Sequence, residues 1–150
     1  LRPGAGAAGG LGFALQLLGA TYASGAGLMT QLLGLPRLLE DADWLITGEG
    51  CSDRQTLAGK APWMAAQQAQ AQGVPVTLLS GVIQTKDVEA LQQAIHGPCL
   101  SLAPGPHCCF PAAEAPPTAE ACQTDAARWM VKAGKVLGQQ WASSRDLESG

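Results

Sequence analysis

The stretch ADWLITGEGCSDRQTLAGKAP, residues 42–62, decides the fold class of this chain. It opens with a short apolar run, Asp43–Thr47, which predicts a buried strand of a parallel sheet. A polar turn over residues 48–53 follows the strand. The sequence after the turn is rich in Ala and Gln, which predicts a helix over about Gln55–Gln72 that is kinked or restarted at Pro62.

Strand and helix patterns alternate along the rest of the chain. A second apolar strand is expected at 74–80 and a third at 99–103, with helices at 9–18, 25–33, 36–40, 86–95 and 119–141. A proline-rich loop is expected at 104–117 and a frayed tail at 142–150. Strand–helix–strand repeats form right-handed βαβ units. The predicted fold class is therefore α/β, a partial Rossmann-like three-layer parallel sheet with flanking helices. Three strands make a thin sheet, so we expect further strands from sequence outside this chain.

The composition argues against several classes of function. The 150 residues are 47% hydrophobic and 14% charged, which is typical of a globular domain with a real core. A formal net charge of −3 and scattered Lys and Arg residues predict no nucleic-acid partner. No apolar run reaches the roughly 18–20 residues that a membrane helix needs, so no membrane association is expected. The five cysteines form no C-x-x-C pair, which favours reduced thiols and a cytoplasmic location.

The candidate site follows the first predicted strand, because open α/β sheets bind ligands beyond the carboxyl ends of their strands. The loop there is dense in polar and glycine residues: Thr47, Gly48, Glu49, Gly50, Ser52, Asp53, Gln55, Thr56, Gly59 and Lys60. Its glycines allow an anion to approach the backbone, and Glu49 and Asp53 are carboxylates of the kind that Mg²⁺ or a general base requires. Lys60 has the charge to stabilise a transferring phosphoryl group. We expect Glu49 and Asp53 to lie together at the rim of the sheet, facing a helix start that can hold phosphate.

Each of these residues also has a plainer interpretation. Asp53 is suited to cap the following helix, Glu49 to a solvated turn and Lys60 to an exposed helix surface. Gly4–Gly9 matches G-x-G-x-x-G, but no strand precedes it, and residues 48–60 do not form a Walker A sequence. The cluster after a buried strand, rather than any single residue, favours a site.

Three motifs occur in order along the chain. They are PGAGAAGGLG at 3–12, ADWLITGEG at 42–50 and D-x-Q-T-L-x-G-K-A-P at 53–62, and GVPV at 73–76 continues the pattern. Together they resemble the bacterial type I glycerate kinase family. The likeness runs from about residue 3 to residue 100 and resumes faintly in the last predicted helix.

The resemblance implies an ATP- and Mg²⁺-dependent kinase that phosphorylates a hydroxyl of D-glycerate. Family members are longer and have two α/β domains around a substrate cleft. This chain therefore corresponds to the C-terminal part of a two-domain kinase, whose missing N-terminal half would be its partner. By that analogy, residues 1–36 lie near the domain junction and residues 37–141 form the Rossmann-like part.

The expected residue roles combine the loop chemistry with this resemblance. The candidate catalytic residues are Asp53, Glu49 and Lys60, and Glu49 and Asp53 are also the candidate metal ligands. Asp53 is the favoured base or metal-orienting carboxylate, and Glu49 is the alternative ligand for Mg²⁺. The candidate substrate- and phosphate-binding residues are Gly4, Gly6, Gly9, Gly10, Thr47, Gly48, Gly50, Ser52, Gln55 and Thr56.

One departure from the family pattern leaves other functions open. Cys51-Ser52 stands where the family usually has Arg-Leu or Arg-Gln-Ser-type residues, so a basic anchor for a carboxylate or phosphate is lost. Much of the cleft is also missing, so we expect this chain alone to have little or no kinase activity. A non-catalytic relative that serves as a binding or regulatory module is the main alternative. A dinucleotide-dependent oxidoreductase is another, and it requires a strand before Gly4.

Overall fold

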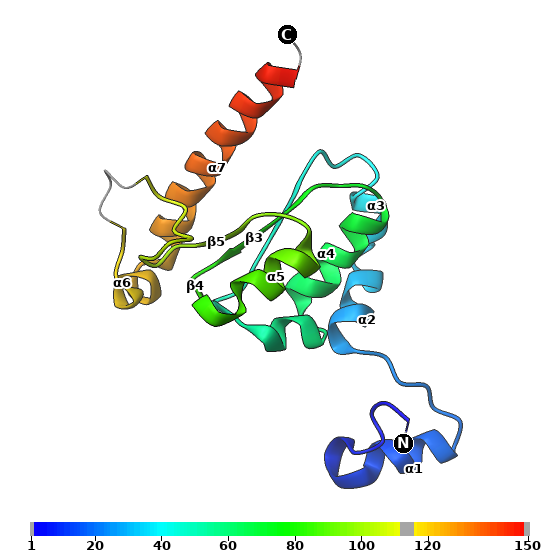
Figure 1. Ribbon diagram of the computed structural model, residues 1–150. Coiled ribbons are helices and arrows are strands. Elements are labelled where there is room, and N and C mark those ends of the chain that lie inside the picture. The colour runs from blue at the N-terminus through cyan, green and yellow to red at the C-terminus, as the bar shows by residue number, and fades with distance from the viewer. Residues whose placement is uncertain (1, 112–115, 149–150) are drawn as a thin grey trace.

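The computed structural model describes residues 2–111 and 116–148 and confirms the α/β fold class (Figure 1). Its helices are α1 (Leu11–Leu17), α2 (Gly25–Leu32), α3 (Leu35–Leu38), α4 (Ala61–Ala71), α5 (Val88–Ile95), α6 (Ala119–Thr124) and α7 (Ala126–Glu148). Three short 3-10 helices are η1 (Ala7–Gly10), η2 (Arg54–Ala58) and η3 (Thr85–Asp87). The strands are β1 (Leu45–Thr47), β2 (Cys51–Ser52), β3 (Val76–Ser80), β4 (Val82–Ile83) and β5 (Cys99–Ser101). Part of the predicted proline-rich loop lies outside the described residues.

The main sheet is parallel, with strand order β1-β3-β5. Leu45 lies opposite Val76, and Leu78 lies opposite Cys99, so all three predicted strands pair in the predicted direction. The connection from β1 to β3 contains α4, and the connection from β3 to β5 contains α5, as βαβ units require. A second, two-stranded parallel sheet of β2 and β4 was not predicted, because strands of two residues leave no periodic signal.

Two apolar clusters on opposite faces of β3 make the fold three-layered. Leu78 is fully buried in the cluster that contains Ala66 of α4 and Leu91 of α5. The next residue, Leu79, belongs instead to the cluster that contains Leu137 of α7. Successive residues of a strand point to opposite faces, so these two leucines fasten helices to both sides of the sheet.

The helix predicted over Gln55–Gln72 is divided in two. The 3-10 helix η2 ends at Gly59, whose φ of 102° is left-handed, and α4 begins two residues later with Pro62 in its first turn. Glycine adopts this φ without strain. Proline is tolerated in the first turn of a helix because the N–H that it lacks would have no intrahelical acceptor there. The restart at Pro62 was one of the two predicted forms.

The last helix was predicted less accurately. It is interrupted at Asp125 between α6 and α7, and α7 then continues to Glu148, so residues 142–148 are helical rather than frayed. Two contacts with the start of the sheet hold this end. The rings of Trp44 and Trp141 stack with centroids 4.8 Å apart, and Arg145 lies 3.3 Å from the carboxylate of Asp43.

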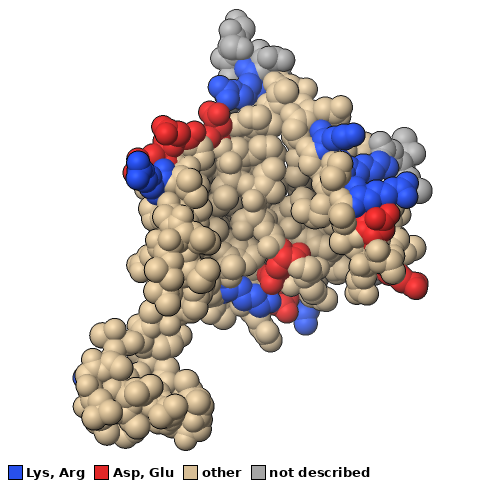
Figure 2. All heavy atoms as spheres, turned by 180° about the vertical axis from the view of Figure 1, so that it is seen from behind, with Lys and Arg blue, Asp and Glu red and all other residues tan. Residues whose placement is uncertain are grey.

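The first third of the chain exposes a large apolar surface. The predicted helices at 9–18 and 25–33 are present as α1 and α2, but α1 lies apart from the body of the molecule (Figure 1). No charged residue occurs between Arg2 and Arg37, and the corresponding lobe is almost free of charge in Figure 2. The large apolar residues exposed there, which we call the 11–38 apolar surface, are Leu11, Phe13, Leu15, Leu17, Leu18, Tyr22, Leu28, Met29, Leu32, Leu33 and Leu38. Within the described residues, no helix is long and apolar enough to cross a membrane.

The stacked tryptophans give a direct test of how α7 is held. Replacing Trp141 by Ala removes the ring that covers Trp44, and we expect the free energy of unfolding to fall by about 1–2 kcal/mol. Denaturant midpoints followed by far-UV circular dichroism measure the change. Gln139→Ala, at an exposed position of the same helix, is the control and should cost less than about 0.5 kcal/mol. Equal midpoints for the two variants would contradict the packing described here.

Candidate functional site

A compact polar cluster follows β1, with the carboxylate of Glu49 at its centre. Glu49 Oε1 accepts hydrogen bonds from the hydroxyls of Thr56, at 2.5 Å, and Ser52, at 3.2 Å. Glu49 Oε2 accepts a hydrogen bond from Lys60 Nζ at 3.2 Å, and the same ammonium lies 3.6 Å from Asp53 Oδ1. Glu49 and Asp53 therefore lie together at the carboxyl edge of the sheet and share one lysine, which is the juxtaposition that the sequence predicts.

The local sequence explains why Lys60 reaches both carboxylates. Asp53 caps η2 by accepting a hydrogen bond from the Gln55 N–H at 2.9 Å, and its own N–H donates to Thr56 Oγ1 at 3.2 Å. The capping interpretation of Asp53 is thus confirmed. The left-handed Gly59 then reverses the chain after η2 and places Lys60 beside Glu49.

A buried pair of hydroxyls connects this cluster to the central strand. Ser52 and Ser80 are both buried, and their oxygens are 2.7 Å apart. Because the carboxylate of Glu49 accepts the proton of Ser52, Ser80 must donate its own proton to Ser52. Ser80 was not among the predicted site residues, although it ends the second predicted strand and so lies at the sheet edge.

The electrostatics give the two carboxylates different capacities. The hydrogen bond to Glu49, together with the negative charges of Glu49 and Asp53, raises the pKa of Lys60 against the opposing effect of burial. Lys60 is therefore a fixed positive charge at neutral pH. Three donors occupy Glu49, whereas Asp53 accepts one hydrogen bond and a longer ion pair, and its side chain is 33% exposed.

A magnesium ion fits Asp53 better than Glu49. Mg²⁺ is commonly held by one or two carboxylates together with phosphate oxygens and water. Asp53 can take such a role with little rearrangement, but Glu49 would first lose its hydrogen bonds to Thr56 and Lys60. In the described parts of the chain, no group of three or more His, Cys, Asp or Glu side chains is arranged to hold a metal ion by itself.

A polar cavity of about 540 Å³ adjoins Asp53. Its lining residues come from η2 and from the segment after β4: Asp53, Arg54, Gln55, Gln84, Lys86 and Asp87. Asp87 fixes the two segments together by accepting a hydrogen bond from the Arg54 N–H at 3.3 Å. The basic residues Arg54 and Lys86 were not predicted as site residues. The signal that could have found them is the rule that loops after neighbouring parallel strands converge.

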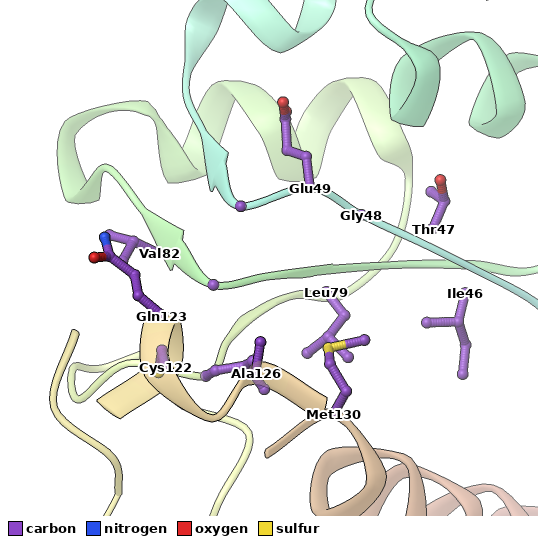
Figure 3. Close-up of a pocket in the computed structure, with 13 residues that line it drawn as sticks. Ile46, Thr47, Gly48, Glu49, Leu79, Val82, Cys122, Gln123, Ala126 and Met130 are labelled. Atoms are coloured by element: carbon purple, nitrogen blue, oxygen red, sulfur yellow. The ribbon is translucent and has the colours of Figure 1, made fainter. Parts of the chain in front are cut away.

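An apolar cavity of about 470 Å³ lies against the loop Gly48–Gly50. In Figure 3, the carboxylate of Glu49 and the side chain of Thr47 point away from Met130 and Ala126, which line the cavity. The loop therefore separates the polar cluster from an apolar hollow between β3 and α7. The backbone of Gly48–Gly50 forms part of its wall.

The glycine-rich segment at the start of the chain is not brought to this loop. Gly4, Gly6, Gly9 and Gly10 lie in or just before η1, in the lobe that stands apart in Figure 1. Pro3–Gly6 form turns, and no described strand precedes Gly4.

The buried cysteines Cys99 and Cys109 are poorly suited to catalysis. All five cysteines are free, and burial raises the pKa of Cys99 and of Cys109 to about 11, which makes these thiols poor nucleophiles. Cys51, at the position of the family departure, is exposed and lies 3.8 Å from the side-chain amide of Gln84.

Several known proteins similar to this chain are described as glycerate kinases. The profile described as "Glycerate kinase family" matches residues 1–141. A glycerate kinase of Halalkalibacterium halodurans is 48% identical over 80 residues, which are 53% of this chain and 21% of that protein. Glycerate 2-kinase of Escherichia coli is 43% identical over 96 residues, 63% of this chain and 24% of that protein. For a glycerate kinase of Bacillus subtilis the values are 39% over 103 residues, 68% and 27%.

The matches cover only part of the length of each relative. The chain spans between 21% and 27% of the length of these three relatives. No solved structure matches it.

The close approach of Gly48 to the next strand makes a sharp prediction. A Cβ atom at Gly48 would lie 1.7 Å from the carbonyl oxygen of Leu79, whereas one at Gly50 meets nothing within 4 Å. We expect Gly48→Ala to lower the free energy of unfolding by about 1–3 kcal/mol, because main-chain atoms must move apart. Gly50→Ala is the matched control and should be close to neutral. Thermal and denaturant unfolding measure both, and equal stability of the two variants would contradict this geometry.

Proposed function

This chain belongs to the glycerate kinase family, and on that premise we propose that it forms part of the active site of an ATP- and Mg²⁺-dependent kinase for D-glycerate. The observation that carries the proposal is the Lys60 ammonium held between Glu49 and Asp53 at the carboxyl edge of a parallel sheet. A fixed cation beside an available carboxylate is the pairing that phosphoryl transfer to a hydroxyl needs.

We assign the residues of the cluster separate roles. Asp53 accepts the proton of the glycerate hydroxyl or orients the metal ion, and Lys60 stabilises the negative charge of the transferring group. Glu49 acts on Lys60, because its hydrogen bond fixes the ammonium and raises the lysine pKa. When bound, ATP supplies the phosphoryl group and its Mg²⁺ ion supplies additional positive charge. Most of the rate then comes from positioning and charge neutralisation.

The polar cavity supports a site for the carboxylate of glycerate. Arg54 and Lys86 line it together with Asp53, so an anion bound there would lie near the proposed base. This arrangement offers basic groups close to Cys51, where the family pattern usually places one. Arg54 forms bidentate contacts with carboxylates more readily than Lys86 does.

The remaining polypeptide of a full-length relative is the proposed partner of this chain. The 11–38 apolar surface consists of eleven exposed large apolar residues, and exposed apolar patches mark protein interfaces. Gly4, Gly6, Gly9 and Gly10 lie in the same lobe, so docking of that polypeptide is the means by which they would join a cleft. The free thiols fit a reducing compartment, and we propose a cytoplasmic location.

A non-catalytic binding module is the second candidate. It is favoured by the exposed Cys51, which stands where the family pattern usually has a basic residue. Calorimetry with Mg·ATP separates the two candidates, because the kinase proposal requires nucleotide binding and loss of that binding favours the module.

The role of Asp53 is tested in a hybrid enzyme in which residues 1–141 replace the matching segment of the Halalkalibacterium halodurans glycerate kinase. We expect Asp53→Asn to lower kcat by more than about tenfold, because the amide neither accepts the proton nor binds the metal well. Asn is also a good helix cap, so folding is retained. Asp41→Asn, at an exposed position outside the cluster, is the control. A change in kcat smaller than tenfold would show that Asp53 is not the base.

Dependence on the rest of the enzyme is tested with this chain alone. We expect no ADP release with D-glycerate and Mg·ATP, because the cleft is incomplete. Adding the separately expressed remainder of the Halalkalibacterium halodurans enzyme should form a one-to-one complex, visible by size-exclusion chromatography, and restore turnover. The remainder alone serves as the blank. Turnover by the isolated chain would overturn this prediction.

A further inference from the structure

The apolar cavity beside the loop Gly48–Gly50 has no part in the proposed binding of glycerate or in the transfer of the phosphoryl group. Its volume of about 470 Å³ is within the roughly 300–1,000 Å³ range of small-molecule sites. The side chains that give it its character are Ile46, Leu79, Val82, Leu102, Ala126 and Met130. It lies at the carboxyl ends of β1 and β3, where open α/β sheets bind their ligands.

The charge of the lining restricts what this cavity can bind. Among the described lining residues, Glu49 is the only Asp, Glu, Lys, Arg or His, and the carboxylate of Glu49 points to the opposite side of the loop (Figure 3). An anion such as glycerate or phosphate would lose its hydration here without gaining a cationic partner, which is strongly unfavourable. The cavity therefore suits an uncharged, mostly apolar group.

One part of the proposed reactants has that character. We propose that this cavity binds the adenine base and ribose of the nucleotide, an inference that rests on the proposed kinase function. A flat aromatic base packs well against Leu79, Val82 and the adaptable thioether of Met130. The side-chain amide of Gln123 and the backbone of Gly48–Gly50 also line the cavity and offer hydrogen-bonding groups.

The loop geometry connects this cavity with the polar cluster. Gly50 carries no side chain, and the space that a Cβ would occupy there is open. A phosphate chain that leaves the cavity over Gly50, toward Lys60 and Asp53, therefore meets no side chain at residue 50 itself. The loop thus divides the nucleotide into an apolar part on one side and a charged part on the other.

The test measures binding to the full chain by isothermal titration calorimetry with three probes: adenosine, Mg·ATP and tripolyphosphate. Ala126 lies at the exposed start of α7 and lines the cavity, so Ala126→Trp fills the cavity without disturbing the core. Ala127 is equally exposed but does not line the cavity, and Ala127→Trp is the matched control. We expect Ala126→Trp to weaken adenosine and Mg·ATP binding at least about tenfold and to leave tripolyphosphate binding unchanged.

A second pair of variants guards against an effect of the added ring on folding. Met130→Ser removes an apolar wall of the cavity, and Val131→Ser makes a similar change at an exposed neighbour that does not line it. Only the first should weaken adenosine binding. Far-UV circular dichroism confirms that each variant is folded.

The outcomes separate this inference from the kinase proposal. If adenosine does not bind, or binds the Ala126→Trp and Ala127→Trp variants equally, the cavity is not the nucleoside site. The kinase proposal still stands in that case if Mg·ATP binds and the hybrid enzyme turns over. If adenosine binding follows the expected pattern but the hybrid never transfers phosphate to glycerate, the nucleoside site stands and the kinase proposal falls.

Discussion

The hydrogen bonds to Glu49 are the constraint on which the rest of the site depends. Through Ser52, Thr56 and Lys60, this one carboxylate joins β2, η2 and the start of α4, and the contact between Ser52 and Ser80 extends the connection to the central strand. Each of these donors offsets part of the hydration that the partly buried carboxylate loses on folding. The anion in turn fixes the position of Lys60, and Lys60 then holds Asp53 nearby. The position of Lys60 thus depends on Glu49, and the position of Asp53 depends on Lys60.

The second constraint is close main-chain packing, which leaves only the backbone of the loop Gly48–Gly50 between its two sides. Gly48 lies against the carbonyl of Leu79, and Gly81 lies against the carbonyl of Gly50, less closely than Gly48 approaches Leu79. A glycine therefore ends each of the strands β1 and β3, and the chain continues into β2 after β1 and into β4 after β3. Because so little material separates the two sides, an apolar hollow and a charged cluster lie back to back across a single stretch of backbone.

Sequence alone could predict the elements whose signals are local. The apolar run ending at Thr47 and the polar residues after it were enough to predict a strand, its direction and the closeness of Glu49 and Asp53. What could not be predicted depends on contacts between distant segments. The helical state of residues 142–148 depends on Trp44 and Asp43, and the division of labour between the two carboxylates depends on which hydroxyls surround Glu49. Arg54 and Lys86 come together only through folding, and the separation of the Gly4–Gly10 segment from the loop has no sequence signal at all.

The absence of charge between Arg2 and Arg37 also determines how this chain behaves in solution. Attraction between exposed apolar surfaces strengthens on warming from low temperature and in the presence of sulfate or phosphate salts. No Asp, Glu, His, Lys or Arg occurs in this stretch, so neither buffer acidity nor ionic screening alters that attraction directly. Cold, low-salt handling therefore favours the dispersed chain, and a shift of pH offers little remedy.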